Sequence, residues 1–376
     1  MRIILDTSII LGEGQSSFRY FSGLIPHLKK VSDLQIELVP SPYMKLPEAW
    51  YSNQQSYQPL LPSAPWLPPG KIRTALSKVK KIVELNRQKK AFAQTGEKTL
   101  FHSFFYTLPP SAHIPLVTMA HDATVEILGP ELGLTHHFEK HLKSKRESLL
   151  KAKRIIAVSE CTKRDIARVY DISPERIDCI HHSVGSDFFP AVSSAPSPFH
   201  KPYFLQVGGR MHHRNFSRLL EAFALGGFQK DYLLVCAGEP WSNEEKGLIQ
   251  KLKLKECLVL IETPTGQKLR ELYQQAEMLV YPSLYEGFGF PLVEAMACGT
   301  PVATSKNGGS IPEIAGEAAL YFDPRDPSDM AKTLSELTNK DSSEALRKKG
   351  FENVKRFSWD QAAEQTVACY RRVFSE

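Results

Sequence analysis

The sequence predicts an α/β protein built from two doubly wound domains. Three observations support this prediction: the length of the chain, its apolar content and the regular recurrence of short apolar runs. The chain has 376 residues, more than one hydrophobic core usually organises, and 42% of them are hydrophobic, which is enough for two cores. Apolar runs that alternate with helical patterns are typical of strands in parallel sheets, which are buried on both faces.

The predicted strands fall into two series, one before residue 190 and one that begins at Tyr203. The first series comprises RIILDTS, LQIELVP, TLFHSFF, LVTMAHD, RIIAVSE and IDCIHHSV, and the second comprises YFLQVGG, YLLVCAG, CLVLIET, MLVYPS, PVATSK and ALYFDP. Because helical patterns separate the runs, each series is expected to form one parallel sheet with helices on its faces.

A segment without strand or helix periodicity separates the two series. Residues 188–202, FFPAVSSAPSPFHKP, are rich in Pro, Ser and Ala. We therefore predict an N-terminal domain over 1–195 and a C-terminal domain over 196–357. Residues 358–376 are expected to form a final helix, because Ser358 begins a capping-box spacing. We expect this helix to pack back towards the N-terminal domain.

Two segments of the N-terminal domain carry an excess of positive charge. Residues 71–90 contain eight basic residues and a single acid, with an apolar stripe along one helical face. Residues 141–154 form a second basic stretch. Two interpretations remain open: either these helices pack their apolar stripes on the core, or they contact an anionic membrane surface. The preceding segment, 40–69, contains eight prolines and predicts neither strand nor helix.

The composition argues against several classes of protein. The six cysteines include no Cys-x-x-Cys pair and no histidine partner at zinc-ligand spacing, which argues against a zinc site or a disulfide framework and fits a reducing compartment. No apolar run is long enough to cross a membrane, and MRIILDTSII carries an acid where a signal peptide is apolar. We expect a cytoplasmic protein, with peripheral contact at the inner membrane face as an open alternative. The net charge of +6 mildly favours anionic partners.

A glycine-rich turn between two glutamates is the principal candidate for a site. In residues 285–299, YEGFGFPLVEAMACG, Glu286 precedes the turn and Glu294 lies in a helix that should begin near Pro291. The strand MLVYPS delivers this turn to the carboxyl edge of a parallel sheet, where doubly wound folds bind ligands. The helix dipole and the backbone N–H groups of the turn favour a phosphate there. These N–H groups belong to Gly287, Phe288 and Gly289.

The two glutamates would then lie on opposite sides of that phosphate. Glu294 is placed to accept the hydroxyl groups of a ribose, and Glu286 is placed near an attached sugar. The alternative is that Glu294 is only an acid favoured by the helix N-terminus and that Glu286 is a solvated loop residue. The position of the turn between a strand and a helix favours the ligand-binding interpretation.

The longer stretch PSLYEGFGFPLVEAMACGTPVATS closely resembles the signature of family 4 of the retaining nucleotide-sugar glycosyltransferases, which have the GT-B architecture. The resemblance extends through RIIAVSECTKRDI, VGGRMHHRNFSRLLEAF, GGSIPEIAGEAALYFDPRDP and the closing FSWDQAAEQTVACYRRV. It covers most of the second half of the chain and fades before residue 100. It implies two Rossmann-like domains that face each other across a cleft, with Glu286 on the transferred sugar and Glu294 on the nucleotide ribose.

The resemblance also implies cations that bind the donor diphosphate. Arg214, in VGGRMHHRN, matches the family's diphosphate-binding lysine position, and a planar guanidinium suits two phosphate oxygens. Family members with two cations usually carry an arginine two residues after the strand's valine, where this chain has Gly209, followed by Arg210. Arg210 and His213 are therefore weaker candidates for donor contacts, and simple exposure to solvent is their alternative.

Two further candidates lie in the N-terminal domain. His121 ends the strand LVTMAHD and resembles the family's histidine at the acceptor side of the cleft, which implies a hydrogen bond to the donor sugar or the leaving phosphate. A histidine at a strand end is otherwise a capping or core residue. The turn GEGQSS follows the first strand and opens a helix, so Gly12 and Gly14 are candidate phosphate contacts, although the family usually has Gly-Ile-Gly-Arg-Tyr there.

These features together imply a retaining hexosyltransferase. The motifs resemble the mannosyltransferase-rich part of the family, which implies transfer of mannose from GDP-mannose to a saccharide or lipid-linked saccharide. No Asp-x-Asp triplet is present, so we expect neither a metal at the phosphates nor a cofactor besides the donor substrate. A UDP-sugar donor and a non-catalytic nucleotide-sugar-binding protein remain alternatives. A nucleic-acid-binding protein is suggested by charge alone, and the chain lacks an aromatic-interleaved basic motif.

Overall fold

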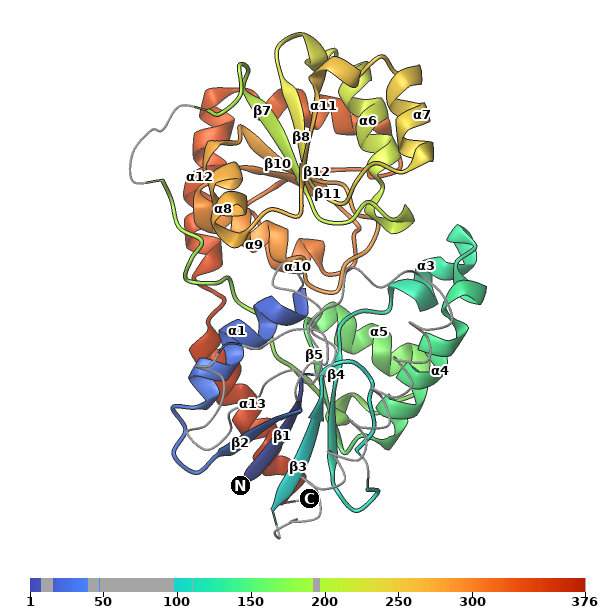
Figure 1. Ribbon diagram of the computed structural model, residues 1–376, viewed down its shortest axis with the longest axis vertical. Helices are drawn as coiled ribbons and strands as arrows, with labels where there is room; N and C mark the ends of the chain where they lie inside the picture. Colours follow the sequence, from blue (N-terminus) through green and yellow to red (C-terminus); the bar gives the residue numbers. More distant parts are fainter. Residues whose placement is uncertain (8–15, 40–46, 48–97, 110, 192–196, 376) are drawn as a thin grey trace, which may run out of the picture.

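The structure is a computed structural model that describes residues 1–7, 16–39, 47, 98–109, 111–191 and 197–375 (Figure 1). It consists of two α/β domains, drawn one above the other in Figure 1, each built around its own sheet. This confirms the predicted fold class. The candidates Gly12 and Gly14, the basic segment 71–90 and almost all of the proline-rich segment lie outside the described residues.

The N-terminal domain contains a six-stranded parallel sheet in the order β2-β1-β3-β4-β5-β6. Its central strands are buried along their whole length, as continuous apolar runs predict, and Ile3 of β1 lies opposite both Ile36 and Leu100. The strands are β1 (Arg2–Asp6), β2 (Gln35–Val39), β3 (Thr99–Ser103), β4 (Leu116–Ala120), β5 (Arg154–Ala157) and β6 (Ile177–Cys179). The helices are α1 (Ser16–Leu28), α3 (Thr124–Leu132), α4 (Thr135–Lys151) and α5 (Glu160–Tyr170).

The C-terminal domain repeats the pattern with a second parallel sheet, in the order β12-β11-β10-β7-β8-β9. Its strands are β7 (Tyr203–Val207), β8 (Leu233–Gly238), β9 (Leu258–Glu262), β10 (Met278–Tyr281), β11 (Val302–Ser305) and β12 (Leu320–Phe322). Its helices are α6 (Phe216–Leu225), α7 (Asn243–Lys251), α8 (Gly266–Gln275), α9 (Phe290–Cys298), α10 (Ile311–Ala315), α11 (Pro327–Leu337) and α12 (Lys340–Val354). The strand order reverses between β10 and β7, so the loops after these two strands meet at one edge.

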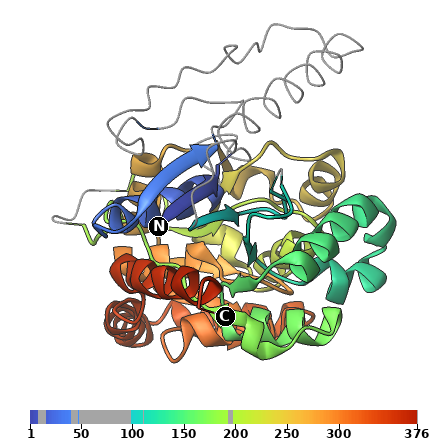
Figure 2. The ribbon, with the colours of Figure 1, turned by 90° about the horizontal axis from the view of Figure 1, so that it is seen from below.

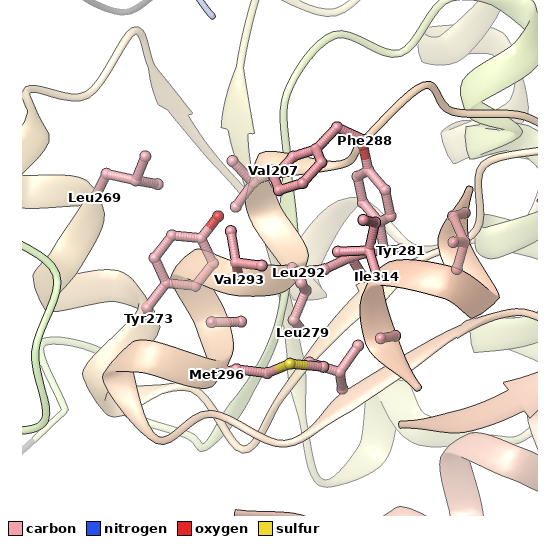
Figure 3. Packing of buried hydrophobic residues seen from close by; sticks show 14 of the residues in the cluster. Val207, Leu269, Tyr273, Leu279, Tyr281, Phe288, Leu292, Val293, Met296 and Ile314 are labelled. Carbon is pink, nitrogen blue, oxygen red and sulfur yellow. The ribbon is translucent and has the colours of Figure 1, made fainter. Parts of the chain in front are cut away.

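Helix α9 is buried on all sides, so its one charged residue, Glu294, lies in the core of the domain. Every side chain from Pro291 to Cys298 is buried, and α9 contacts α8, α10 and α12 as well as the sheet. Figure 3 shows Leu292, Val293 and Met296 of this helix in the core of the domain. A helix that is apolar around its whole circumference is typical of a domain core, so the carboxylate of Glu294 requires partners there.

The final helix, α13 (Trp359–Val373), lies against the N-terminal domain (Figures 1 and 2). Its Trp359 packs so tightly on α1 that a Cβ added at Gly23 would lie 2.0 Å from the indole. Near its other end, Tyr370 forms a buried hydrogen bond of 2.6 Å with His102 of β3. Ser358 caps the helix by accepting from Gln361 N. The chain thus crosses from the C-terminal domain back to the N-terminal one before it ends.

No helix within the described ranges has both the length and the apolar character needed to cross a membrane.

Candidate functional site

The glycine-rich turn has the structure that its sequence predicts. Strand β10 ends at Tyr281, and α9 begins at Phe290 with a proline in its first turn. Gly289 has φ 90°, and Gly299, which ends the helix, has φ 78°; both lie in the left-handed region that glycine adopts most easily. In the part of the chain that the structure describes, no acceptor receives a hydrogen bond from the backbone N–H groups of Gly287, Phe288 and Gly289. The turn therefore offers free donors beside a helix N-terminus.

Glu286 is tied to the C-terminal domain by its backbone and by an ion pair. Its N–H donates to Gly308 O at 3.0 Å and its carbonyl accepts from Ser310 N at 3.0 Å. Its carboxylate accepts from the guanidinium of Arg214, which also donates to the hydroxyl of Tyr281. The side chain of Glu286 is 9% exposed and that of Arg214 is 27% exposed. The structure thus brings together the two residues for which the sequence predicts sugar and phosphate roles.

Arg214 is held as a cation in this setting. Burial alone lowers the pKa of Arg214, but the charge of Glu286 and the hydrogen bond to Tyr281 raise it above its ordinary value. The residue closes a short 3₁₀ turn, His212–Arg214, just before α6. His213 in the same turn is half-buried, and burial lowers its pKa while the charge of Glu286 acts in the opposite direction. Arg214 is therefore in direct contact with the carboxylate of Glu286, and the charge of that carboxylate also acts on His213.

Glu294 has a partner on each of its two oxygens. Arg19 of α1 donates to Oε1 at 2.5 Å, and Tyr273 of α8 donates its hydroxyl to Oε2 at 2.9 Å. Glu294 is only 1% exposed, and its burial raises its pKa, although Arg19 and Tyr273 oppose that change. Since Arg19 belongs to the N-terminal domain, the predicted ribose-binding carboxylate is already in contact with both domains.

Arg210 belongs to a different network. Its Nε donates to Glu245 at 2.7 Å, and its Nη2 donates to the carbonyls of Glu239 and Pro240. The guanidinium lies 4.5 Å from the ring centroid of Trp241, and the side chain is 3% exposed. These contacts fix the loop between β8 and α7. The structure therefore does not bring Arg210 into the group formed by Glu286, Arg214 and Tyr281, and its role as a donor contact stays a prediction.

His121 lies against the turn from the other domain. Its Nε2 donates to the carbonyl of Phe104 at 2.6 Å, which assigns the second ring nitrogen, Nδ1, as the acceptor. Burial lowers the pKa of His121, so the imidazole is neutral at pH 7. A Cβ added at Gly287 would lie only 1.6 Å from the carbonyl oxygen of His121. The backbone of His121 is therefore in direct contact with the glycine-rich turn.

Sequence reasoning missed three residues around the site. Arg19 and Glu313 form contacts between the two domains, and Tyr273 donates to Glu294 within the C-terminal domain. No motif in the sequence indicates these contacts. Glu313 of α10 accepts from the backbone N–H groups of Glu160 and Cys161, at 2.8 and 2.9 Å, at the start of α5. The one feature of the sequence that could have indicated a site role for Arg19 is its position in the first turn of the helix after a predicted phosphate-facing turn.

The contact of Glu313 with the N-terminal domain also contains a cluster of potential metal ligands, which the spacing of the cysteines did not predict. His181 lies 2.7 Å from a carboxylate oxygen of Glu313 and 3.9 Å from the thiol of Cys179, and the three potential metal-ligand atoms lie within 4.8 Å of one another. Glu313 already accepts hydrogen bonds on both oxygens. We therefore interpret these side chains as a hydrogen-bonded contact between the domains.

Both halves of the chain match family models of glycosyltransferases. Residues 38–188 match the model of "Glycosyltransferase Family 4", and residues 191–354 match "Glycosyl transferases group 1". The O-antigen chain mannosyltransferase B of Escherichia coli is 30% identical over 267 residues, which are 68% of this chain and 70% of that protein. The O-antigen chain mannosyltransferase RfbU of Salmonella typhimurium is 30% identical over 194 residues, 50% of this chain and 52% of that protein.

Solved structures with the same fold cover the whole chain. Sucrose-phosphate synthase from Thermosynechococcus elongatus superposes with a TM-score of 0.76 at 20% identity, covering 100% of this chain and 99% of that one. Anabaena HepE, solved in complex with UDP and glucose, superposes with a TM-score of 0.68 at 15% identity, covering 99% and 100%. At these identities the likeness concerns the fold.

The family predicted from the glycine-rich turn is thereby confirmed. Since both halves match glycosyltransferase models and the Escherichia coli relative is 30% identical over 70% of its length, the chain belongs to the family 4 glycosyltransferases.

Proposed function

We propose that this glycosyltransferase transfers mannose from GDP-mannose to a saccharide or lipid-linked saccharide, with retention of the anomeric configuration and without a metal ion. The observation that carries the proposal is the group formed by Glu286, Arg214 and the free N–H donors of residues 287–289, next to the buried Glu294. The sugar is inferred from the two O-antigen relatives, whose names describe mannosyltransferases.

The proposed donor orientation follows from the charges of these residues. The diphosphate lies at the N-terminus of α9, where the helix dipole, the free N–H groups and Arg214 all favour negative charge. The ribose lies against Glu294, and the sugar lies against Glu286 on the other side of the turn. Arg214 bridges the two regions, because it donates to Glu286 while its charge remains near the turn.

The reaction that this arrangement supports begins with cleavage of the bond between the anomeric carbon and the leaving phosphate oxygen. Negative charge that develops on that oxygen is stabilised by Arg214 and the N–H groups, and stabilisation by preorganised dipoles is usually the largest contribution to catalysis. The acceptor hydroxyl attacks from the same face and gives its proton to the leaving diphosphate. Glu286 orients the sugar, and the neutral imidazole of His121 is suited to hydrogen-bond a sugar hydroxyl.

Nucleotide-dependent unfolding tests the donor. The purified protein is melted with saturating GDP, UDP or ADP in separate samples, all with EDTA. A ligand at about one hundred times its Kd stabilises the folded state by about 2.7 kcal/mol, which a melting curve resolves. A shift with GDP alone supports the proposed donor, and a shift with UDP alone replaces it with a UDP-sugar. The absence of any shift contradicts the nucleotide site.

Transfer is then measured with GDP-mannose, EDTA and a saccharide acceptor. We expect a mannosylated product by mass spectrometry and an α-linkage by NMR, as retention requires. A β-linkage contradicts retention, and activity only after metal addition contradicts the metal-free mechanism. Nucleotide binding without any transfer favours the alternative of a non-catalytic protein of the same fold.

The proposal of a lipid-linked acceptor rests on the basic residues of α4 and of the short segment that follows it. The structure divides the stretch 141–154 into two groups: Lys145 and Arg154 are buried in ion pairs with Glu126 and Asp178, whereas Lys143, Arg146, Lys151 and Lys153 are exposed. Exposed cations bind anionic lipid surfaces, and salt weakens this attraction. We expect the protein to sediment with anionic liposomes at low salt and to be released at high salt. No sedimentation at low salt contradicts a membrane-bound acceptor.

A further inference from the structure

Glu286 belongs to the C-terminal domain, but the residue before it is held by the N-terminal one. The hydroxyl of Tyr285 donates to Asp165 of α5 at 2.5 Å. The ring of Tyr285 and the side chain of Leu284 pack against Leu128 of α3 in a small apolar cluster, and the three residues are 6%, 6% and 8% exposed. Burial and then the hydrogen bond to Asp165 raise the pKa of Tyr285, so the hydroxyl remains a donor.

The residue after Glu286 is held by the same domain. Gly287 approaches the backbone of His121 so closely that any Cβ would overlap the carbonyl oxygen, and Thr162 of α5 donates to the carbonyl of Gly287 at 3.4 Å. Glu286 is therefore flanked on both sides by contacts with α3, α5 and the end of β4. These contacts on each side fix the direction in which the side chain of Glu286 points.

Helix α5 is itself fixed to the C-terminal domain. The carboxylate of Glu313 receives the first backbone N–H groups of α5, from Glu160 and Cys161. A carboxylate at this position satisfies orphan helix donors and interacts favourably with the helix dipole. Helix α5 thus docks on α10 at its N-terminus and on the glycine-rich turn along its own first two turns.

From these contacts we infer that Tyr285 and Asp165 are positioning residues, which place the carboxylate of Glu286 for reaction only when the two domains are docked through α5. This inference rests on the proposed function of Glu286. The predicted nucleotide contacts of Arg214 and Glu294 do not involve the Tyr285–Asp165 hydrogen bond. Loss of that bond should therefore lower turnover much more than it weakens nucleotide binding, because a small misplacement of a reacting group is costly to rate.

The kinetic test uses the full-length protein with Tyr285→Phe, which removes the hydroxyl and keeps the ring, and with Asp165→Ala. We expect kcat to fall by about tenfold in both variants, with the Kd for GDP changed by less than about twofold. Asp165→Asn keeps a carbonyl acceptor and should recover part of kcat. The matched control is Tyr170→Phe, because Tyr170 also lies on α5 but donates to Glu126 within its own domain. A wild-type kcat in Tyr285→Phe overturns the inference, as does an equal loss in Tyr170→Phe.

A second measurement does not depend on transfer. Amide hydrogen exchange of residues 284–290 and 160–165 is compared between the wild type, Tyr285→Phe and Tyr170→Phe, each with saturating GDP. We expect faster exchange in both segments of Tyr285→Phe alone, because the turn and α5 are docked through that hydroxyl. Unchanged exchange overturns the inference. If the wild type binds GDP but transfers no hexose, the proposed function fails, while the exchange comparison still decides whether Tyr285 docks the turn.

Discussion

Arg19 of the N-terminal domain donates to Glu294 of the C-terminal domain at 2.5 Å, and the sequence separation between them is 275 residues. Glu294 is 1% exposed and Arg19 is 23% exposed, so a buried carboxylate of one domain pairs with a partly buried cation of the other. A buried carboxylate that loses its cation is strongly disfavoured as an anion. Arg19 therefore favours the ionised form of the predicted ribose-binding group, and it occupies one of the two oxygens that a ribose would use.

The first prediction concerns the pH dependence of nucleotide binding in Arg19→Ala. Burial raises the pKa of Glu294 and Arg19 lowers it, so the variant has a still higher pKa. The ribose needs the carboxylate, which is present above this pKa and lost as the pH falls through it. Affinity for GDP should thus decline at a higher pH in Arg19→Ala than in the wild type.

Isothermal titration calorimetry from about pH 5 to about pH 8 measures this difference. Arg19→Lys is the control, because it keeps a cation beside Glu294, although without the planar guanidinium. Superimposable affinity profiles for the wild type and Arg19→Ala would show that Arg19 does not govern the ionisation of Glu294.

The second prediction concerns Glu294→Ala. Removing the carboxylate deletes the proposed acceptor of the ribose hydroxyls, and hydrogen bonds to charged groups contribute about 1.5–3 kcal/mol, which is about tenfold or more in Kd. We expect GDP to bind at least about tenfold more weakly, as measured by calorimetry. Because the side chain lies within a core helix, Glu294→Gln is the companion variant that keeps the volume. Wild-type affinity in both variants refutes the ribose role.

The third prediction concerns Glu286→Gln. The substitution removes the charge that faces Arg214 and the proposed sugar, but it leaves Arg214 its hydrogen bond to Tyr281. We expect turnover to fall by more than about tenfold while the Kd for GDP barely changes, the pattern for a group that acts mainly in the transition state. Initial rates with GDP-mannose check this result. Near-normal turnover removes Glu286 from the catalytic residues.

The sequence predicts the fold and the centre of the site for the same reason. Continuous apolar strands require parallel sheets, and parallel strands place their carboxyl ends at one edge. The meeting of Arg214 with Glu286 could be anticipated because each follows a strand that ends at that edge. Proline and glycine at the two ends of α9 similarly indicate where the helix begins and ends.

Contacts between domains could not be predicted in this way. Tyr285 and Asp165 are 120 residues apart, and His181 and Glu313 are 132 residues apart. Hydrophobic periodicity describes how an element packs within its own domain, and it carries no information about how two finished domains dock. Arg210 illustrates a related difficulty, since a cation after a strand can pair with a neighbouring loop as readily as with a phosphate.

The fourth prediction concerns Gly287→Ala. A single methyl group would meet the carbonyl oxygen of His121 at 1.6 Å, an overlap that only movement of the backbone relieves. The turn would then shift away from the N-terminal domain, while its N–H groups remain. We expect turnover to fall at least about a hundredfold and GDP binding to weaken as well, because the displaced N–H groups are the proposed diphosphate contacts. Gly209→Ala is the control, because nothing lies within 4 Å of a Cβ added there. Equal activity of the two variants argues against the close approach.

The fifth prediction links the domain contact to pH through Glu313. Burial raises the pKa of Glu313, but the hydrogen bonds from His181 and from two backbone N–H groups of α5 outweigh burial and bring it below 4.5. A carboxyl group with a lowered pKa stabilises the folded state above pH 4.5, and this contribution disappears as the pH falls through the lowered value. Glu313→Gln should therefore melt about 2–4 °C below the wild type at neutral pH, the shift expected for about 1 kcal/mol.

The difference should shrink below pH 4.5, where the wild-type carboxylate also becomes protonated. Differential scanning fluorimetry at a series of pH values measures it. Glu317→Gln is the matched control, because that side chain is 94% exposed and lies 3.9 Å from Lys349, a geometry that contributes little to stability. A deficit in Glu313→Gln that stays constant with pH would mean that packing, rather than the charge at the start of α5, holds this contact together.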